Sequence, residues 1–246
     1  MSLVDFELSK DYSYIKITGS DFNLNSFEKF KEIIKNLNQK NCIKKVSIEG
    51  NFNSKLLVNE IFSKSGKTSL DDLLYLLQGL AKTIEDSDIL FTANINGIAK
   101  GPAMEIALAC NFVKAKTGTI FNFTKNEKIF FLGTIQRLIN ILGYKKTLQL
   151  LLIEKTINFK DATDLKIINS NIDKTLIRNK PFWDQAFTNT FIFFNSKIHS
   201  TYKNLIPEYM AILSIIFESS ICDYEVGLSI ERRWVKWLML NNIKKS

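Results

Sequence analysis

The chain has 246 residues, of which 46% are hydrophobic, and it carries a formal net charge of +8. This length and apolar content can supply a sizeable core, as one large domain or as a core with an appendage. The 33 Lys and Arg residues are scattered along the chain, and no common nucleic-acid recognition motif accompanies them. We therefore expect a charged surface in water and no nucleic-acid partner.

The cysteines and the hydropathy pattern bear on the cellular compartment. Cys42, Cys110 and Cys222 lie far apart without paired spacing, which argues against a disulfide framework or a zinc site and favours a reducing compartment. No apolar run reaches the length of a membrane-spanning helix, and charges occur throughout the first part of the chain, so neither a membrane span nor a signal peptide is expected. The sequence predicts a cytoplasmic protein.

Strand and helix patterns alternate through most of the chain, which predicts an α/β core with mostly parallel strands. Expected strands cover 6–8, 14–18, 45–48, 89–95, 112–114 and 119–123. Expected helices cover 27–37 (capped by Ser26), 70–84, a segment opened by Pro102, 134–142, 145–152 and 161–165, with 51–55 as a loop and a short helical or irregular stretch at 56–62.

Pro181 marks the expected boundary between two regions. Residues 1–180 form the predicted α/β core, and residues 181–246 form a helical region with helices at 183–196, 207–219 and 224–240. An all-helical region after such a core either mediates oligomerisation, acts as a lid, or only caps the core. The sequence pattern leaves these interpretations open.

The stretch from Ala93 to Asn111 contains the most informative residues, because a strand there meets a glycine-containing turn and then a helix. Gly101 has no Cβ and lets the backbone pass close to another group. Glu105 lies among small and apolar helix residues, where burying a carboxylate costs several kcal/mol unless it is paired or its pKa shifts. Glu105 is therefore either an acid favoured by the dipole at the start of the helix or a functional group.

Other catalytic arrangements are not supported by the sequence. His199, the only histidine, lies in the helical region without a nucleophile motif nearby, so it is expected at the surface. Gly97 and Gly101 lack the third glycine of a dinucleotide-binding turn. No cluster of histidines, cysteines or carboxylates has the spacing of a metal site, and none is expected.

The segment from Asn96 to Asn111 resembles the pattern N-G-x-A-x-G-G-G-x-E-L-A-x-x-C-D of the enoyl-CoA hydratase/isomerase (crotonase) family. Residues 121–143 and 150–168 are similar to the next two family segments, and 207–240, with Glu231, is similar to its C-terminal helices. The resemblance implies a crotonase-like spiral of ββα units. It also implies a C-terminal all-helical region that forms trimers, which often pair as hexamers.

The resemblance further implies a site for an acyl-CoA thioester, with coenzyme A as part of the substrate and no separate cofactor. Glutamates in such a site move protons or activate water. Glu105 matches the first family glutamate. Lys125 stands where the second glutamate is expected, and Glu127, two positions further on, is the candidate to replace it.

Two backbone N–H groups stabilise the thioester oxygen in the family. Ser54 matches the residue that supplies the first N–H, and Lys55 replaces the glycine that follows it. Gly101 opens the turn that carries the second N–H, but Pro102 occupies the donor position and has no N–H. These departures predict a degenerate active site.

Two functions are therefore compatible with the sequence. The first is hydration or double-bond isomerisation of an enoyl-CoA, as in fatty acid metabolism, with Glu105 as the principal acid/base. The second is a non-catalytic relative that binds coenzyme A or serves in assembly. Both carry the family's expectation of a homotrimer or hexamer.

Overall fold

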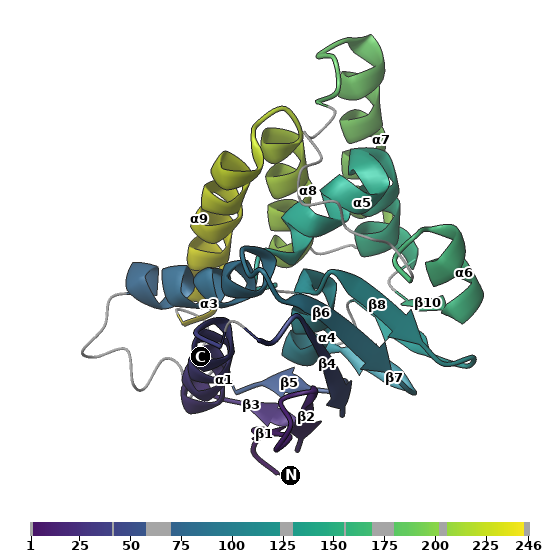
Figure 1. Ribbon diagram of the computed structural model, residues 1–246. Helices are drawn as coiled ribbons and strands as arrows, with labels where there is room; N and C mark the ends of the chain where they lie inside the picture. Colours follow the sequence, from purple (N-terminus) through teal and green to yellow (C-terminus); the bar gives the residue numbers. More distant parts are fainter. Residues whose placement is uncertain are drawn as a thin grey trace.

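The computed structural model describes residues 2–40, 42–57, 70–123, 130–154, 156–168, 180–201 and 206–243. Four consecutive stretches repeat the order strand, strand, helix (Figure 1). They comprise β2 (Tyr14–Thr18), β3 (Asp21–Phe22) and α1 (Leu24–Asn38); β4 (Lys45–Gly50), β5 (Lys55–Leu56) and α3 (Leu70–Glu85); β6 (Leu90–Ile95), β7 (Ile98–Lys100) and α4 (Gly101–Ala109); and β8 (Phe112–Ala115), β9 (Ile120–Asn122) and α5 (Thr134–Gln149).

The first strands of these units form one sheet and the second strands form two smaller ones. The large sheet has the order β1-β2-β4-β6-β8, in which β1 (Asp5–Leu8) is antiparallel to β2 and the other pairs are parallel. The small sheets are β3-β5 and β10-β9-β7, where β10 is Thr156–Asn158. A parallel bridge between Asn53 and Lys100 joins the two small sheets. The predicted α/β class, with mostly parallel strands, is confirmed.

The helical region predicted after Pro181 is present. It contains α7 (Gln185–Thr201), α8 (Pro207–Ser220) and α9 (Tyr224–Ile243), after η1 (Leu150–Glu154) and α6 (Phe159–Asp164). Helix α8 packs against α5 and α9, and α9 also packs against α3 (Figure 1). These contacts place the C-terminal helices directly over the start of α5. The division into domains 1–180 and 181–246 stays a prediction.

The cap predicted for the first helix was wrong by one turn. Helix α1 begins after Asn23, whose side-chain oxygen accepts a hydrogen bond from the Ser26 N–H at 3.0 Å. Ser26 lies inside the helix, and its hydroxyl donates to the Val4 carbonyl at 3.0 Å. Both asparagine and serine can cap a helix. Asn23 is the cap here, and the Ser26 hydroxyl instead has a buried partner in the Val4 carbonyl.

Residues expected in loops also form short strands. Lys55 and Leu56 form β5 because β3 supplies a parallel partner, so Leu56 does not begin a helical or irregular stretch. The rest of that stretch lies outside the described residues. Such two-residue strands depend on partners far away in the chain, so local periodicity carries no signal for them.

Gly143 separates two helical segments, as predicted, although they are nearly continuous. Its φ of 75° and ψ of 162° interrupt α5, and Tyr144 follows directly. The Tyr144 ring stacks on Phe191 of α7 with centroids 5.9 Å apart and lies 5.1 Å from the Phe187 ring. The kink therefore directs an aromatic side chain of the α/β core towards the C-terminal helices.

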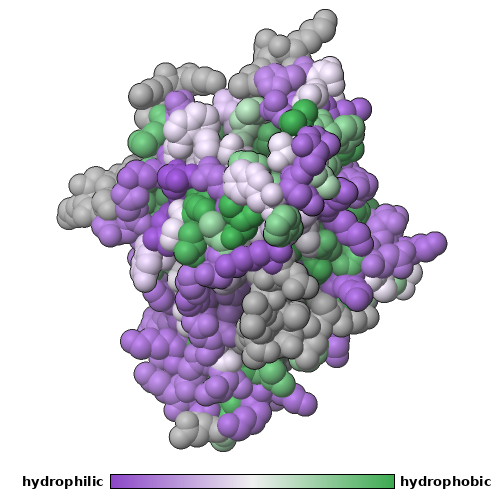
Figure 2. All heavy atoms as spheres, turned by 90° about the horizontal axis from the view of Figure 1, so that it is seen from above, coloured by the Kyte–Doolittle hydropathy of each residue, from purple (hydrophilic) through white to green (hydrophobic). Residues whose placement is uncertain are grey.

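The face formed by the C-terminal helices includes apolar surface. Figure 2 shows the molecule from above, with hydrophobic residues gathered near the middle of that face and hydrophilic residues around them. A groove of about 330 Å³ lies between α7 and α8, and Phe191, Ile192, Leu213 and Phe217 are among its lining residues. Ile192 is 56% exposed.

Candidate functional site

The turn before α4 has the predicted order of strand, glycine turn and helix, with β7 added between turn and helix. Gly97 has a φ of +91° after Asn96, and Gly101 has a φ of +66° at the start of α4. Residues with a Cβ rarely adopt this left-handed conformation, which explains the two glycines. Because α4 begins at Gly101, Glu105 lies in its second turn, beyond the first turn where the helix dipole acts most strongly.

Ser54 is buried next to the start of α4, and both its N–H and its hydroxyl have partners. Its backbone N–H donates to the Lys100 carbonyl at 3.2 Å, and its hydroxyl donates to the same oxygen at 3.0 Å. The hydroxyl oxygen also accepts from the Ala103 N–H at 2.9 Å. The N–H that the resemblance assigns to the thioester oxygen is therefore engaged within the protein.

Of the neighbouring site residues in the sequence prediction, Lys55 and Pro102 supply no backbone N–H to this position, because the Lys55 N–H donates to the Ser20 carbonyl. Pro102 is buried in the first turn of α4 and has no N–H. Lys55 lies in β5, and its ammonium group forms an ion pair with Asp21 at 3.6 Å. The structure thus brings Ser54, Gly101 and Pro102 together and pairs Lys55 with β3.

Lys125 and Glu127 lie outside the described residues. The described chain ends at Phe123 on one side of them and resumes at Phe130 on the other, and both phenylalanines are buried. The roles assigned to Lys125 and Glu127 stay predictions.

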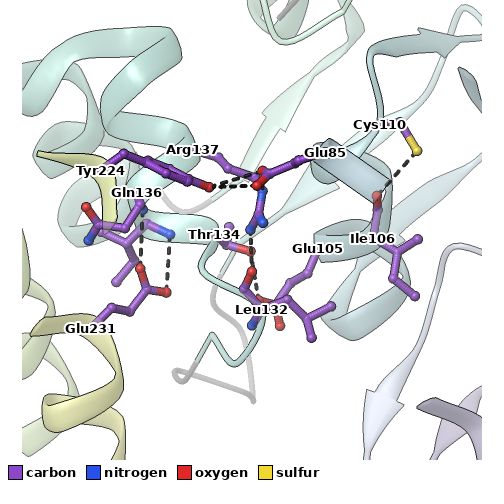
Figure 3. Close-up of polar contacts among 11 residues, drawn as sticks. Glu85, Glu105, Ile106, Cys110, Leu132, Thr134, Gln136, Arg137, Tyr224 and Glu231 are labelled. Carbon is purple, nitrogen blue, oxygen red and sulfur yellow. Dashed lines mark hydrogen bonds and ion pairs between the residues drawn. The ribbon is translucent and has the colours of Figure 1, made fainter. Parts of the chain in front are cut away.

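Glu105 is 2% exposed, and its carboxyl accepts hydrogen bonds from a turn that precedes α5 (Figure 3). Oε2 accepts from the Phe131 N–H at 3.0 Å, the Leu132 N–H at 3.0 Å and the Thr134 hydroxyl at 2.7 Å. Oε1 receives only a longer contact from the Phe131 N–H, at 3.3 Å. The two oxygens therefore differ, and Oε1 keeps more capacity to accept a proton.

Burial raises the pKa of Glu105 to about 7, although the three donors from Leu132, Thr134 and Phe131 act to lower it. A carboxyl with a pKa near neutrality exists in both protonation states at physiological pH. It can take up a proton and release it again, which is the property required of a general acid/base.

A second buried carboxyl, Glu231 of α9, lies on the other side of the same turn (Figure 3). It accepts hydrogen bonds from the Gln136 N–H at 3.3 Å and the Ile135 N–H at 3.5 Å, the first amides of α5. Burial, followed by the charge of Glu105, raises its pKa to about 8.

Glu231 has no role in the sequence prediction, although the residues around it carry a signal. Leu228, Glu231, Val235 and Leu238 recur at helical spacing and all four are buried. A carboxylate on the apolar stripe of a helix is as unusual as Glu105 in α4. The same criterion that selected Glu105 would therefore have selected Glu231.

Arg137 provides the positive charge next to these carboxyls. Its Nε forms an ion pair with Glu85 of α3, and its Nη1 donates to the Leu132 carbonyl. Burial acts to lower the pKa of Arg137, but the charges of Glu85 and Tyr224 act to raise it. The net shift of the pKa is upward, so the guanidinium stays charged. The Tyr224 hydroxyl donates to the Glu85 carboxylate, with distances of 3.1 and 3.2 Å to its two oxygens (Figure 3).

No family model matches the chain, and no curated protein matches its sequence. Solved structures do match. An enoyl-CoA hydratase from Bacillus halodurans gives a TM-score of 0.59 over 97% of this chain and 95% of its own, at 20% identity. An enoyl-CoA hydratase from Bacillus anthracis gives 0.52 over 95% and 89%, at 18% identity. An enoyl-CoA hydratase/carnithine racemase from Magnetospirillum magneticum gives 0.55 over 68% and 67%, at 13% identity.

These structures show the class of fold. The chain has the fold of the enoyl-CoA hydratase/isomerase (crotonase) proteins, a spiral of ββα units with a C-terminal helical region, as the sequence resemblance predicted. Within the described residues, no helix is long and apolar enough to cross a membrane. The same residues contain no group of three or more histidine, cysteine or acidic side chains placed to hold a metal ion.

Proposed function

We propose that this chain belongs to the crotonase family and acts on an acyl-CoA thioester, with Glu105 as the group that carries the proton. The observation that supports this proposal is the carboxyl of Glu105 itself. It is buried in the helix after the glycine turn of a crotonase fold, with a pKa of about 7. A group with this pKa satisfies the requirement for proton transfer near neutral pH.

Double-bond isomerisation is the reaction that a single carboxyl performs most simply. The Glu105 carboxylate removes a proton from C2 of a 3-enoyl-CoA, the electron pair moves to form the 2,3 double bond, and the protonated carboxyl returns the proton at C4. Hydration requires the same group to take a proton from water and deliver it to C2. In both reactions the active form of Glu105 at the start is the carboxylate.

The backbone around Ser54 and Pro102 predicts a low rate. Removing one donor to the developing oxyanion typically slows an enzyme by about 10²–10³-fold. Here the Ser54 N–H is bound to Lys100 and position 102 has no N–H. We therefore expect weak turnover.

The test is to incubate the protein with crotonyl-CoA and with a 3-enoyl-CoA and to follow the ultraviolet absorbance of the conjugated thioester. Hydration lowers this absorbance and isomerisation raises it. Glu105→Gln should abolish either change. Glu28→Gln is the control, because Glu28 is an exposed glutamate of α1. Turnover that survives Glu105→Gln would contradict the proposal.

The second candidate function is non-catalytic, and the bonds of Ser54 favour it. Ser54 binds Lys100 and Ala103 through three hydrogen bonds, so a thioester oxygen would have to displace them. A relative of this kind would bind coenzyme A or serve in assembly. Calorimetric binding of coenzyme A without turnover of either substrate would support it, and measurable turnover would exclude it.

The proposed assembly is a homotrimer or a hexamer formed through the C-terminal helices. Its support is the apolar surface on α7 and α8, including the groove lined by Phe191 and Phe217. Light scattering coupled to size-exclusion chromatography measures the mass directly, and a monomer at micromolar concentration would contradict this assembly. We also infer a cytoplasmic location from the unpaired spacing of the three cysteines.

A further inference from the structure

One short segment connects the two buried glutamates. We define the α5 entry segment as residues 131–137. Its beginning donates three hydrogen bonds to Glu105 of α4, through Phe131, Leu132 and Thr134. Its next two N–H groups, of Ile135 and Gln136, point to Glu231 of α9. The last residue, Arg137, folds back to the Leu132 carbonyl. One segment thus carries the hydrogen-bond donors of both carboxyls.

We propose that Glu231 is a positioning residue for Glu105, because its carboxyl fixes the α5 entry segment whose N–H and hydroxyl groups hold the Glu105 carboxyl in place. This inference rests on the proposed function of Glu105 and adds a C-terminal residue to that site. In this role Glu231 makes no contact with the substrate. It acts on Glu105 only through the α5 entry segment and through its charge.

Close packing makes this connection stiff. Gly133, in the middle of the α5 entry segment, has a φ of +81° and lies against Leu228 of α9. A Cβ at Gly133 would come within 2.5 Å of Leu228 Cδ2 and 3.2 Å of Arg137 Nη1. The Leu228 carbonyl in turn accepts a hydrogen bond from Gln78 Nε2 of α3 at 3.0 Å. Helix α9 is thus fixed both to the segment and to α3, one turn before Glu231.

The charges around Glu231 add an electrostatic connection. The ionisable groups that interact with it are Glu105 from α4, Arg137 from α5 and Tyr224 from its own helix, and Glu85 from α3 pairs with Arg137 and Tyr224 in turn. From α8, the uncharged Ser219 hydroxyl accepts a hydrogen bond from Gln136 Nε2 at 3.2 Å. Three carboxyls therefore share one guanidinium. The charge of Glu105 raises the pKa of Glu231, so the two carboxyls titrate as a coupled pair.

The experiment titrates Glu105 without requiring turnover. Protein labelled with carbon-13 at the glutamate side-chain carboxyls is titrated by NMR, and Glu105→Gln assigns the Glu105 signal. In Glu231→Gln the neutral amide oxygen can still accept from Ile135 and Gln136, but the like charge is gone. Glu231 has the higher pKa and is mostly neutral when Glu105 loses its proton, so the Glu105 midpoint should change little in this variant. Glu28→Gln, an exposed control position in α1, should also leave it unchanged.

Glu231→Asp tests the positional part, because the shorter side chain keeps the charge but does not reach the two N–H groups. Hydrogen exchange of the Ile135 and Gln136 amides should then become faster by about tenfold or more, and the Glu105 midpoint should shift as its donors move. In any active protein kcat should fall and KM should stay within about twofold. The melting temperature of each variant shows that it is folded.

An unchanged Glu105 midpoint together with unchanged exchange of the Ile135 and Gln136 amides in folded Glu231→Asp would overturn the inference. If Glu231→Gln does not fold, Glu231→Asp alone decides between the outcomes. The proposed enzymatic function fails separately, because absence of turnover in the unsubstituted protein leaves the titration of Glu105 measurable.

Discussion

The two ends of the candidate site differ in how their polar groups are used. At the start of α4, the Ser54 N–H and hydroxyl bind Lys100 and Ala103, and Pro102 has no N–H. Around Glu105 and Glu231, by contrast, carboxyls with pKa values of about 7 and 8 are buried with a charged arginine. At the first end the N–H and hydroxyl groups are bound within the protein. At the second end the carboxyls can take up and release protons.

Under the proposed function, this difference indicates which part of the crotonase chemistry would remain. A buried carboxyl must be supported by donors or it destabilises the fold, so Glu105 is embedded in a network that also stabilises the protein. Backbone donors to a thioester have no such structural duty, because water or a neighbouring carbonyl can satisfy them. A protein can therefore lose the backbone donors while it keeps the carboxyl.

The largest expected effect is on stability, from Glu105→Ala. The substitution leaves the Phe131 and Leu132 N–H groups and the Thr134 hydroxyl without their acceptor in a buried place. Each unsatisfied group costs about 1–3 kcal/mol, so we expect the free energy of unfolding to fall by roughly 3 kcal/mol or more. Urea denaturation measures it. A loss below about 1 kcal/mol would show that the network does not support the fold.

Pro102→Ala and Pro102→Gly test the closed end by restoring an N–H at the start of α4. If this N–H points at the thioester oxygen, kcat/KM should rise by about 10²-fold. Alanine and glycine supply the same donor but differ in backbone freedom, so a similar gain in both identifies the N–H as the cause. A gain in the glycine variant alone would point to flexibility instead.

The pH dependence of stability tests the carboxyl end. The pKa of Glu105 is raised from 4.5 to about 7, and that of Glu231 is raised from 4.5 to about 8. Between pH 4.5 and about 8 the folded state therefore binds more protons than the unfolded state. The free energy of unfolding should fall as pH rises from about 5 to 8, by up to about 1.4 kcal/mol per pH unit for each carboxyl. Glu231→Gln should reduce this slope, and equal slopes in both proteins would contradict the assignment.

Activity should depend on pH in the opposite direction. The proposed reactions begin with the Glu105 carboxylate, so the rate should increase as pH rises through about 7. A pH–rate profile with 3-enoyl-CoA between pH 5.5 and about 8 measures it. A rate that falls over this interval would show that the protonated form of Glu105, or another group, begins the reaction.

The smallest expected effect belongs to Ser54→Ala. The change removes the acceptor of the Ala103 N–H and the hydroxyl donor to Lys100, but it keeps the Ser54 N–H. Loss of such a cap costs about 1 kcal/mol, which denaturation resolves. Stability should thus respond less to Ser54→Ala than to Glu105→Ala. The reverse order would invalidate the contrast between the two ends.

The sequence predicted the large elements because their apolar residues recur at regular spacing. The Leu70–Glu85 helix and the Leu90–Ile95 strand are clear cases. The two-residue strands β3 and β5 escaped prediction because each is defined by its partner in another unit. The cap at Asn23 depended on the Val4 carbonyl, which only the folded chain brings near Ser26. The local sequence pattern predicts the long helices and strands. It cannot choose between two possible cap residues when a contact from a distant part of the chain makes that choice.

The candidate site was predictable to a similar extent. Glu105 stands out as a carboxylate in an apolar helix, and the family resemblance gives it a role. The engagement of the Ser54 N–H was not predictable, because it requires the bridge between Asn53 and Lys100. Glu231 carried a signal in its helix, but its contact with Ile135 spans 96 positions of the sequence. No local pattern names such a partner.

The position of Glu231 late in the chain has a consequence for the order of folding. A ribosome makes Ile135 and Gln136 long before Glu231, so the N–H groups that start α5 have no buried carboxyl while the chain is being extended. The strands and α4 can assemble earlier from contacts closer in sequence. The hydrogen bonds from Ile135 and Gln136 to Glu231 can form only after α9 has been made and has packed against α5. The support that Glu231 gives to the α5 entry segment is therefore available only once the last described helix is in place.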